Sequence, residues 1–281
     1  MSYQKIIVDD PRPQVRRITL NRPDKRNPLS NELRTEMFDA LEKGDQDPSV
    51  RVMIIRGAGE CFSAGYDLKS NVAQQQPFYS AGGLGNWPRH VVDGFFKIWD
   101  LAKPVIAQVH GYCLAGGTEL ATACDLVYVA EDAKIGYPVV RSISPPDNQF
   151  YPWIVGLRRA MELMLTGDHM SGVEAVDCGF ANKAFPLATL EDSVLQIAER
   201  VAKVPTDIQQ INKRAVHRQM DAMGIRAGIR AGTEMQTLAT FTASTQAHLA
   251  ELRKKWRGIV RAGRCFRVIL HAENRLSLVT V

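Results

Sequence analysis

The chain has 281 residues, of which 45% are hydrophobic and 23% are charged, and its formal net charge is +5. This composition is ordinary for a globular protein that buries a sizeable core. No window approaches the ~18 apolar residues of a membrane-spanning helix, which argues against an integral membrane protein. The start, MSYQKIIVDDPRPQVRR, lacks the apolar segment of a secretory signal, so we expect a cytoplasmic protein.

Basic residues and cysteines argue against two further classes of protein. The positive charge is spread along the chain, and we interpret its one cluster, RKKWR at 253–257, as a solvated helix face and not as a nucleic-acid site. The five cysteines include no C-x-x-C pair, and no histidine stands at metal-ligand spacing. We therefore expect no disulfide framework, no structural metal and no redox cofactor.

The first part of the chain predicts three strands and one amphipathic helix. KIIV (5–8) and VRRITL (15–20) are short apolar strands joined by a Pro-rich turn. Ser30 is a candidate N-cap for a helix with four apolar side chains on one face, at Leu33, Met37, Ala40 and Leu41. VRVMIIRG (50–57) is apolar enough for a strand that is covered on both faces.

The middle of the chain predicts a long loop and then strands that alternate with a helix. Residues 70–90 contain glutamines, glycines and prolines without periodicity, and a loop of this length is usually functional. PVIAQVHG (104–111) and LVYVA (126–130) are apolar strands, and a helix is expected between them at 116–124. This alternation predicts an α/β core with crossover connections.

The C-terminal part is predicted to be mostly helical. Residues 161–180 indicate a helix, a turn and a second helix, 191–204 form a clean amphipathic pattern, and 206–262 lack strand signals. We therefore divide the chain into a core at 1–195 and a helical region at 196–262. The last residues, 263–281, lose the helical charge pattern, and we interpret them as an atypical tail, disordered or foreign to the fold.

The stretch HGYCLAGGTEL (110–120) has the glycine spacing of a phosphate-binding loop without its lysine. Gly111, Gly116 and Thr118 fit that loop, but Gly117 stands where the lysine neutralises phosphate. What remains is a buried strand, a glycine turn and a helix beginning at Gly116. The first N–H groups of a helix favour negative charge, so this turn predicts an oxyanion site with Glu119 close by as acid or base. His110, just before the turn, is expected in the core.

An oxyanion site needs a second donor, and CFSAGYDLK (61–69) offers one. An apolar strand runs into a tight turn at Ala64 and Gly65, and Tyr66 follows at the start of the next segment. Either motif alone is weak. Together, the two predict a pair of backbone N–H groups that converge on one oxygen.

The two motifs together resemble the crotonase, or enoyl-CoA hydratase/isomerase, superfamily. LNRPDKRNPLS (20–30) and LTGDHMSGVEAVDCGFANKAFP (165–186) are also similar to that family, and the resemblance spans about 3–260. It implies an α/β spiral of ββα units, a helical trimerisation region and a homotrimer or dimer of trimers. It also implies an acyl-CoA thioester as ligand, with coenzyme A as part of the substrate and no separate cofactor.

The resemblance also implies roles for individual residues. The N–H groups of Tyr66 and Gly116 would bind the thioester oxygen and stabilise an enolate, with Glu119 as acid or base. Lys25 and Arg26 would lie near the nucleotide end of the coenzyme. Further substrate contacts are expected from Ala64, Gly65, Asp67, Leu68, Gly117, Tyr137, Pro138 and Val139.

The chain departs from the family pattern at the second catalytic glutamate. The family's hydratases have a glutamate directly after the proline of a G-x-P-E pattern, but this chain has Val139 after Pro138. Asp147 and Tyr137 are the nearest candidates to assist Glu119, although Asp147 also fits a turn-forming role. Three interpretations follow: a hydratase or isomerase with a different helper, a decarboxylase or other crotonase lyase or hydrolase, and a catalytically silent acyl-CoA-binding protein.

Overall fold

The fold is built on a six-stranded sheet with the strand order β1-β2-β3-β4-β6-β9. The computed structural model describes residues 3–67, 76–262, 266–270 and 276–280. β1 and β2 form an antiparallel hairpin, and every following pair of neighbours is parallel. The strands of this sheet are β1 (Ile6–Arg12), β2 (Val15–Leu20), β3 (Val52–Gly57), β4 (Val105–Val109), β6 (Leu126–Ala130) and β9 (Lys183–Phe185).

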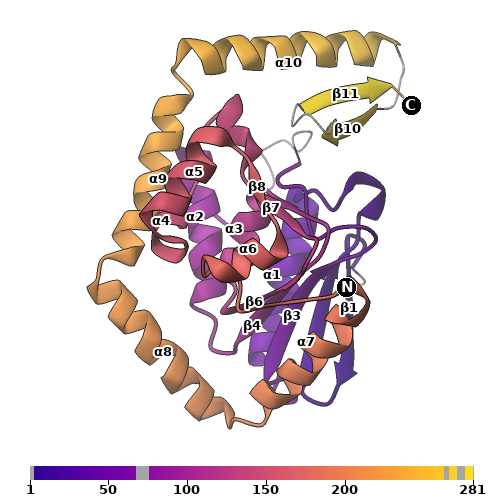
Figure 1. Cartoon of the computed structure of the whole chain (residues 1–281), viewed down its shortest axis with the longest axis vertical. Helices are drawn as coiled ribbons and strands as arrows, with labels where there is room; N and C mark the ends of the chain where they lie inside the picture. The colour runs from indigo at the N-terminus through magenta and orange to yellow at the C-terminus, as the bar shows by residue number, and fades with distance from the viewer. Residues whose placement is uncertain (1–2, 68–75, 263–265, 271–275, 281) are drawn as a thin grey trace.

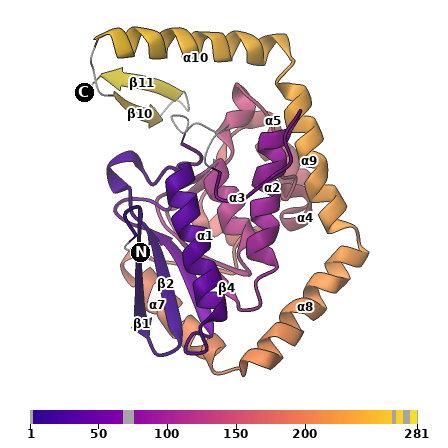
Figure 2. The same cartoon turned by 180° about the vertical axis from the view of Figure 1, so that it is seen from behind.

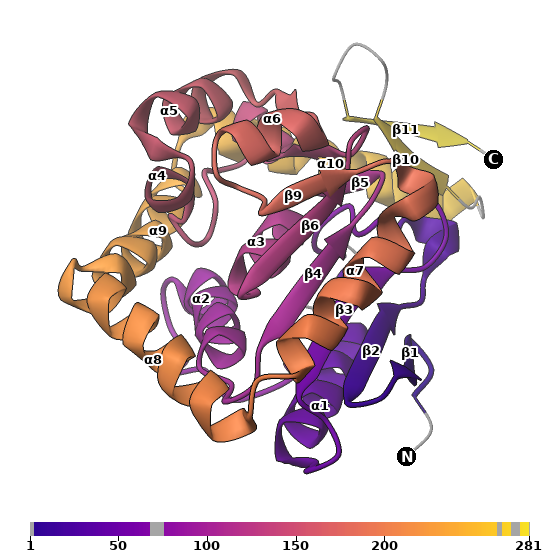
Figure 3. The same cartoon turned by 60° about the horizontal axis from the view of Figure 1, so that its bottom comes forward.

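The central strands are buried because helices cover both faces of the sheet. In β3 the four residues from Val52 to Ile55 are fully buried, and all of β4 is buried as well. Helix α7 (Leu187–Ala202) crosses one face over β3 and β4, as Figure 3 shows. Helix α1 (Asn31–Gln46) lies across the other face (Figure 2). This burial explains why both strands are continuous apolar runs in the sequence.

The predicted start and buried face of the first helix are confirmed. The hydroxyl of Ser30 accepts a hydrogen bond from the backbone N–H of Leu33 at 3.3 Å, as an N-cap does. Leu33, Met37, Ala40 and Leu41 are all buried. The cap fixes where α1 begins, and the apolar stripe fixes how the helix is rotated against the sheet.

A second, three-stranded sheet carries the segment that enters the glycine turn. Its order is β5-β7-β8, with β5 and β7 parallel and β7 and β8 antiparallel. The predicted strands at 104–111 and 126–130 and the helix at 116–124 are confirmed as β4, β6 and α3. The elements of this region are β5 (Tyr112–Leu114), α3 (Gly116–Ala123), β7 (Lys134–Gly136), β8 (His169–Met170) and the 3-10 helix η2 (Pro138–Arg141).

The predicted loop at 70–90 is wrong at its C-terminal end. Helix α2 (Asn86–Trp99) begins at Asn86, so the last residues of that range are helical. Gly85 precedes the helix with φ 74°, and the turn sits against Thr237, so tertiary packing helps to set this start. Residues 68–75 lie outside the described residues, and with them the predicted substrate contact at Leu68.

The C-terminal region is helical as predicted. Figure 1 shows α8, α9 and α10 running round one side of the molecule, and α9 packs against α2. The two helices expected at 161–180 are present as α5 and α6, and between them the chain turns at Gly167 and forms the short strand β8. The remaining helices are α4 (Tyr151–Ile154), α5 (Gly156–Thr166), α6 (Gly172–Asp177), α8 (Thr206–Ala222), α9 (Ile225–Ala239) and α10 (Ala243–Ala262), with the 3-10 helix η1 at Pro23–Lys25.

The tail contains regular structure in its described part. β10 (Phe266–Leu270) and β11 (Leu276–Thr280) form an antiparallel pair. The oligomerising role of 196–262 stays a prediction, although α5 presents an exposed apolar stripe at Leu157, Met161 and Leu165. Among the described residues, no helix is both long and apolar enough to span a membrane.

Candidate active site

The two predicted motifs lie side by side in the fold. The backbone of Ser63 pairs in parallel with Cys113 of β5, its N–H donating to the carbonyl of Tyr112 at 3.0 Å. Its own carbonyl accepts from the N–H of Leu114 at 3.0 Å. This short ladder carries both strands in the same direction into their glycine turns, so the turns end next to each other.

Three glycines allow the two turns to touch. Gly65 has φ 104°, and a Cβ placed there would lie 3.2 Å from the backbone nitrogen of Gly116. A Cβ on Gly117 would lie 2.6 Å from the carbonyl oxygen of Ser63. A Cβ on Gly116 would lie 2.5 Å from a ring carbon of Tyr66. Side chains at these positions would force the turns apart, which explains why the motif contains glycine there.

The N–H of Tyr66 has no backbone partner within the described residues. Leu29 bridges this segment by donating to the carbonyl of Gly65 at 2.8 Å and accepting from the N–H of Asp67 at 3.3 Å. In such a parallel bridge, the residue between the two bonded groups directs its own N–H to the opposite side. The N–H of Tyr66 therefore points away from Leu29 and remains available to a ligand.

The N–H of Gly116 is available because it opens helix α3. The N–H groups of Thr118 and Glu119 both donate to the carbonyl of Ala115, so the described hydrogen bonds of the first turn begin after Gly116. Ala115 has φ 50° and ψ −123°, a sparsely populated conformation for a residue with a side chain. Strain of this kind persists where the surrounding structure holds a functional geometry in place. The strained backbone at Ala115 therefore points to this turn as a candidate functional site.

Glu119 is buried directly beside these donors. Its side chain is 2% exposed, and its carboxylate accepts from the hydroxyl of Tyr66 at 3.1 Å, from the hydroxyl of Tyr137 at 3.4 Å and from the N–H of Asp147 at 3.0 Å. Burial, followed by repulsion from the Asp147 carboxyl, raises the pKa of Glu119 well above its ordinary value. The three hydrogen bonds oppose that rise. Glu119 is therefore positioned as a proton-carrying group.

Asp147 lies beside Glu119 and is buried as well. It is 4% exposed, and its Oδ1 has no hydrogen-bond partner among the described residues. Burial raises the pKa of Asp147 to about 7, and the positive charge of Arg34 limits that rise. A turn-forming aspartate bonds nearby backbone, and a hydrogen bond to its own backbone also limits the rise in the pKa of Asp147. The burial, the neighbouring carboxyl and the unpartnered oxygen favour the acid–base role over that alternative.

The loop that carries Asp147 is held by helix α9. The N–H of Gln149 donates to the carbonyl of Ile229 at 3.2 Å. A Cβ on Gly232 would lie 2.6 Å from the carbonyl oxygen of Asp147. The C-terminal helical region therefore fixes the position of this carboxyl group.

Sequence reasoning missed three residues at the site. Arg34 from α1 is 3% exposed, and its guanidinium carbon lies 5.6 Å from the ring centre of Tyr66 and 5.4 Å from that of Trp87. The rings of Tyr66 and Trp87 meet edge to face at 5.0 Å. His90 is fully buried and stacks on Phe78 at 4.1 Å. Two of the three, Trp87 and His90, belong to α2, the helix that was also missed.

The other predicted contacts lie around these residues with varied exposure. Lys25 is exposed on η1, and the guanidinium of Arg26 lies 5.0 Å from the ring of Tyr112. Asp67 forms an ion pair with Arg22 at 2.7 Å. Ala64 is exposed, Pro138 is buried, and Val139 packs against the core.

His110 has the core role expected of it. It is buried, and its Nε2 lies 2.9 Å from the carbonyl oxygen of Gly59. The ring therefore fastens the end of β4 to the turn after β3 and takes no part in the cluster around Glu119.

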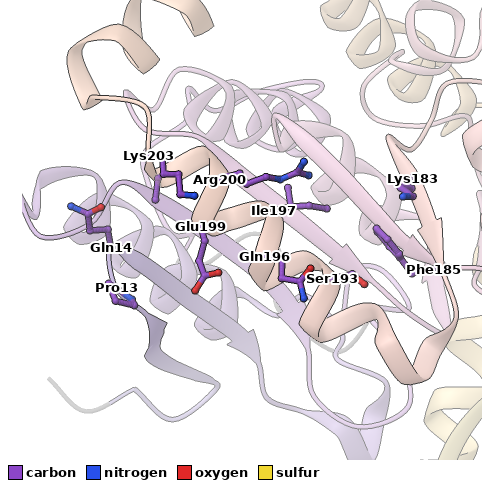
Figure 4. A pocket seen from close by; sticks show the side chains of 11 residues that line it. Pro13, Gln14, Lys183, Phe185, Ser193, Gln196, Ile197, Glu199, Arg200 and Lys203 are labelled. Atoms are coloured by element: carbon purple, nitrogen blue, oxygen red, sulfur yellow. The ribbon is translucent and has the colours of Figure 1, made fainter.

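A separate depression of about 640 Å³ lies beside α7, away from these residues. Figure 4 shows its lining side chains, which come from α7, β9 and the turn between β1 and β2. Lys183, Arg200 and Lys203 make the lining basic. None of the residues predicted for the site lines this depression, so the candidate active site is the buried cluster around Glu119.

Comparison with known proteins gives the same assignment as the two motifs. The family model described as enoyl-CoA hydratase/isomerase matches residues 12–258. The chain belongs to this family. It is 36% identical over 241 residues to the putative enoyl-CoA hydratase EchA13 of Mycobacterium tuberculosis. The aligned region covers 79% of this chain and 75% of that protein. It is 32% identical to the hydroxycinnamoyl-CoA hydratase-lyase of Pseudomonas fluorescens, over 66% of this chain and 68% of the relative.

Solved structures of the family share the fold. A crystal structure of an enoyl-CoA hydratase/isomerase from Xanthobacter autotrophicus Py2 aligns with a TM-score of 0.81 and 30% identity. The alignment covers 93% of this chain and 97% of that one. The expected crotonase fold is thereby confirmed.

Proposed function

We propose that this member of the enoyl-CoA hydratase/isomerase family is an enzyme that acts on an acyl-CoA thioester through a thioester enolate. Its relatives are named for enoyl-CoA and hydroxycinnamoyl-CoA chemistry, which supports a CoA thioester as substrate. The two available N–H groups at Tyr66 and Gly116 supply the donors that an enolate oxygen requires. Donors fixed in advance stabilise the charge that develops on that oxygen in the transition state.

The observation that carries the proposal is the buried carboxyl of Glu119 beside these donors. Burying a carboxyl group costs free energy. The buried carboxyl of Glu119 accepts three hydrogen bonds, from Tyr66, Tyr137 and Asp147, which offset part of that cost. A raised pKa favours the protonated form of this carboxyl group, which can deliver its proton to carbon or oxygen. In the proposed reaction Glu119 transfers a proton next to the thioester carbonyl.

Asp147 supplies the second carboxyl that Val139 cannot. Two carboxyl groups that share a buried site titrate as a pair, and one of them loses its proton first. Arg34 lowers the pKa of Asp147, so we assign Asp147 as the group that ionises and accepts a proton from water. Glu119 is then the acid. Hydration needs this combination of one base and one acid.

Decarboxylation is a second candidate, favoured by Val139. Loss of CO₂ from the acyl group gives the same enolate and requires no second carboxyl group. The buried pair of Glu119 and Asp147 makes hydration or isomerisation the better-supported reaction. The same pair also argues against a silent acyl-CoA-binding protein, because binding alone does not explain two costly buried carboxyl groups.

Turnover of matched CoA esters in wild type and a Glu119→Gln variant tests the proposal. A panel of enoyl- and malonyl-type esters is incubated with the enzyme, and products are identified by mass. We expect Glu119→Gln to lower kcat by about 10²- to 10⁴-fold, because positioned proton transfer contributes that much. Glu251→Gln, at an exposed position on α10, is the control and should leave kcat unchanged.

The product decides between the candidate reactions. Addition of water or migration of the double bond supports the proposal, and release of CO₂ supports decarboxylation. Tight binding of every ester with no turnover of any would refute the enzymatic role. Unchanged turnover in Glu119→Gln would refute the role of this residue.

A further inference from the structure

Arg34 carries a buried positive charge that forms no direct ion pair within the described part of the chain. It lies in α1 and is 3% exposed. Among the described residues, no Asp or Glu oxygen lies within 4.0 Å of its guanidinium, and its described hydrogen bond is to the side-chain oxygen of Gln76 at 3.2 Å. Arginine is almost never fully buried unless it is paired. The missing partner points to an anion supplied by a ligand.

The aromatic rings around Arg34 leave its hydrogen-bond donors available. The guanidinium packs near Tyr66 and Trp87, with distances of 5.6 and 5.4 Å to the two ring centres. Contacts of this kind use the electrostatic attraction of the ring, not the five N–H groups of the guanidinium. One nitrogen is engaged by Gln76. The others can form the two parallel bonds with which arginine recognises a carboxylate.

The position of Arg34 places such an anion on the acyl group of the substrate. The Tyr66 ring contacts Gly116 on one side, where a Cβ would lie 2.5 Å away, and its hydroxyl bonds Glu119 at 3.1 Å. The same ring is adjacent to Arg34. The Tyr66 ring thus lies between Arg34 and Gly116, whose N–H is one of the proposed donors to the thioester oxygen. A group bound there belongs to a short acyl chain and lies close to the carbons that react.

His90 provides an independent observation in the same place. Its Nε2 is buried and has no hydrogen-bond partner among the described residues, while its Nδ1 lies 2.8 Å from the hydroxyl of Ser80. The His90 ring lies 6.3 Å from that of Trp87, which also adjoins Arg34. If Ser80 donates to Nδ1, the neutral ring carries its proton on Nε2. A second donor is then available next to Trp87, the ring that Arg34 also contacts.

We propose that Arg34, assisted by His90, binds a carboxylate at the far end of the acyl group, so that the preferred substrates are CoA thioesters of short dicarboxylic acids. This inference rests on the proposed function, because it places the thioester at Tyr66 and Gly116. The competing explanation is that Arg34 serves only to offset the Glu119 and Asp147 carboxyl groups. That explanation predicts that kcat/KM does not depend on which group ends the acyl chain.

Two enoyl-CoA esters of equal chain length test the proposal, one ending in a carboxylate and the other in the neutral primary amide. We expect wild type to favour the carboxylate in kcat/KM by about 10- to 100-fold, as for a hydrogen bond to a charged group. Arg34→Met should lose that preference, because it slows both esters through Asp147 and slows the carboxylate ester further by about 10- to 100-fold. Arg34→Lys should retain part of it, and Arg12→Met, at an exposed ion pair, should retain all of it.

Two results would overturn the proposal. One is equal kcat/KM for the two esters in wild type, a measurement that does not depend on any variant folding. The other is an equal loss on both esters in Arg34→Met with an unchanged circular dichroism spectrum, which assigns Arg34 to the carboxyl pair. If no ester of the whole panel turns over, the proposed function fails on its own. Calorimetric affinities of the two saturated esters then decide whether Arg34 binds the carboxylate.

Discussion

Replacing Gly116 by alanine should disable the site through a contact that can be specified atom by atom. The new Cβ would lie 2.5, 2.6 and 3.0 Å from three ring carbons of Tyr66, and the first two distances are shorter than those of real Cβ contacts. The ring cannot retreat freely, because Trp87 meets its edge at 5.0 Å and Arg34 adjoins it. Either the ring or the Gly116 backbone must move. Both movements misplace a proposed oxyanion donor or the hydroxyl that holds Glu119.

The expected losses follow from these contacts. Overpacking in a dense region costs ~1–3 kcal/mol of folding free energy, or roughly 2–10 °C in Tm for a chain of this size. Misplacing one oxyanion donor costs ~2.7–4 kcal/mol in the transition state, which is about 10²- to 10³-fold in kcat. Steady-state kinetics on a confirmed substrate and thermal unfolding measure the two effects separately.

Two further variants isolate the cause. Gly82→Ala is the matched control, because nothing lies within 4 Å of a Cβ at that position. Gly116→Ala should lower Tm less in a Tyr66→Ala background than in wild type, because the ring it clashes with is gone while the backbone N–H of residue 66 stays in place. Activity of Gly116→Ala within about threefold of wild type would refute the assigned geometry. An equal loss of Tm from Gly116→Ala in both backgrounds would refute the clash.

Two other predictions concern stability. The folded pKa of Asp147 is raised to about 7, above its ordinary value of 3.8, so its contribution to stability is fully present below pH ~4 and is lost as pH rises through 7. Asp147→Asn should therefore gain stability relative to wild type at pH 8 but not at pH 4 in urea unfolding; an equal difference at both pH values would contradict the buried acid. Ser30→Ala should cost ~1 kcal/mol by removing the N-cap of α1, whereas Ser49→Ala in an exposed turn should cost less than half of that. A larger loss in Ser49→Ala would contradict the capping role.

The framework of the fold could be predicted because its signals are local. Strands β3 and β4 are uninterrupted apolar runs. Helix α1 can be recognised in the sequence from its N-cap at Ser30 and the apolar stripe that follows. Helix α2 was missed because its start, Gly85 to Pro88, contains residues typical of loops. Pro88 is tolerated there, since the first turn of a helix leaves its N–H groups unbonded. The deciding contact, from Thr237 in α9, is far away in the sequence.

The two glycine turns of the candidate site could also be predicted, and their N–H groups stay proposed donors, but the side chains around them were predicted only in part. Gly116 and Glu119 stand at fixed positions in a specific motif. Arg34 was missed because a charged residue beside Leu33 is normally a solvated neighbour of the buried stripe. One signal was available: Arg34 precedes the apolar Met37 and Phe38 by three and four residues, which places it on their face of the helix. Its burial depends on Tyr66 and Trp87 and could not be read locally.

The carboxyl pair also changes how the C-terminal helices should be understood. Val139 leaves η2 without a titratable group at the family's second position, and the next carboxyl, Asp147, comes eight residues later in a loop. A loop has no regular hydrogen bonds to hold it, so an acid–base group there needs external support. Helix α9 provides it through Ile229 and Gly232. The helical region therefore helps to hold Asp147 in the candidate site, and the boundary drawn at residue 195 separates segments that contact each other there.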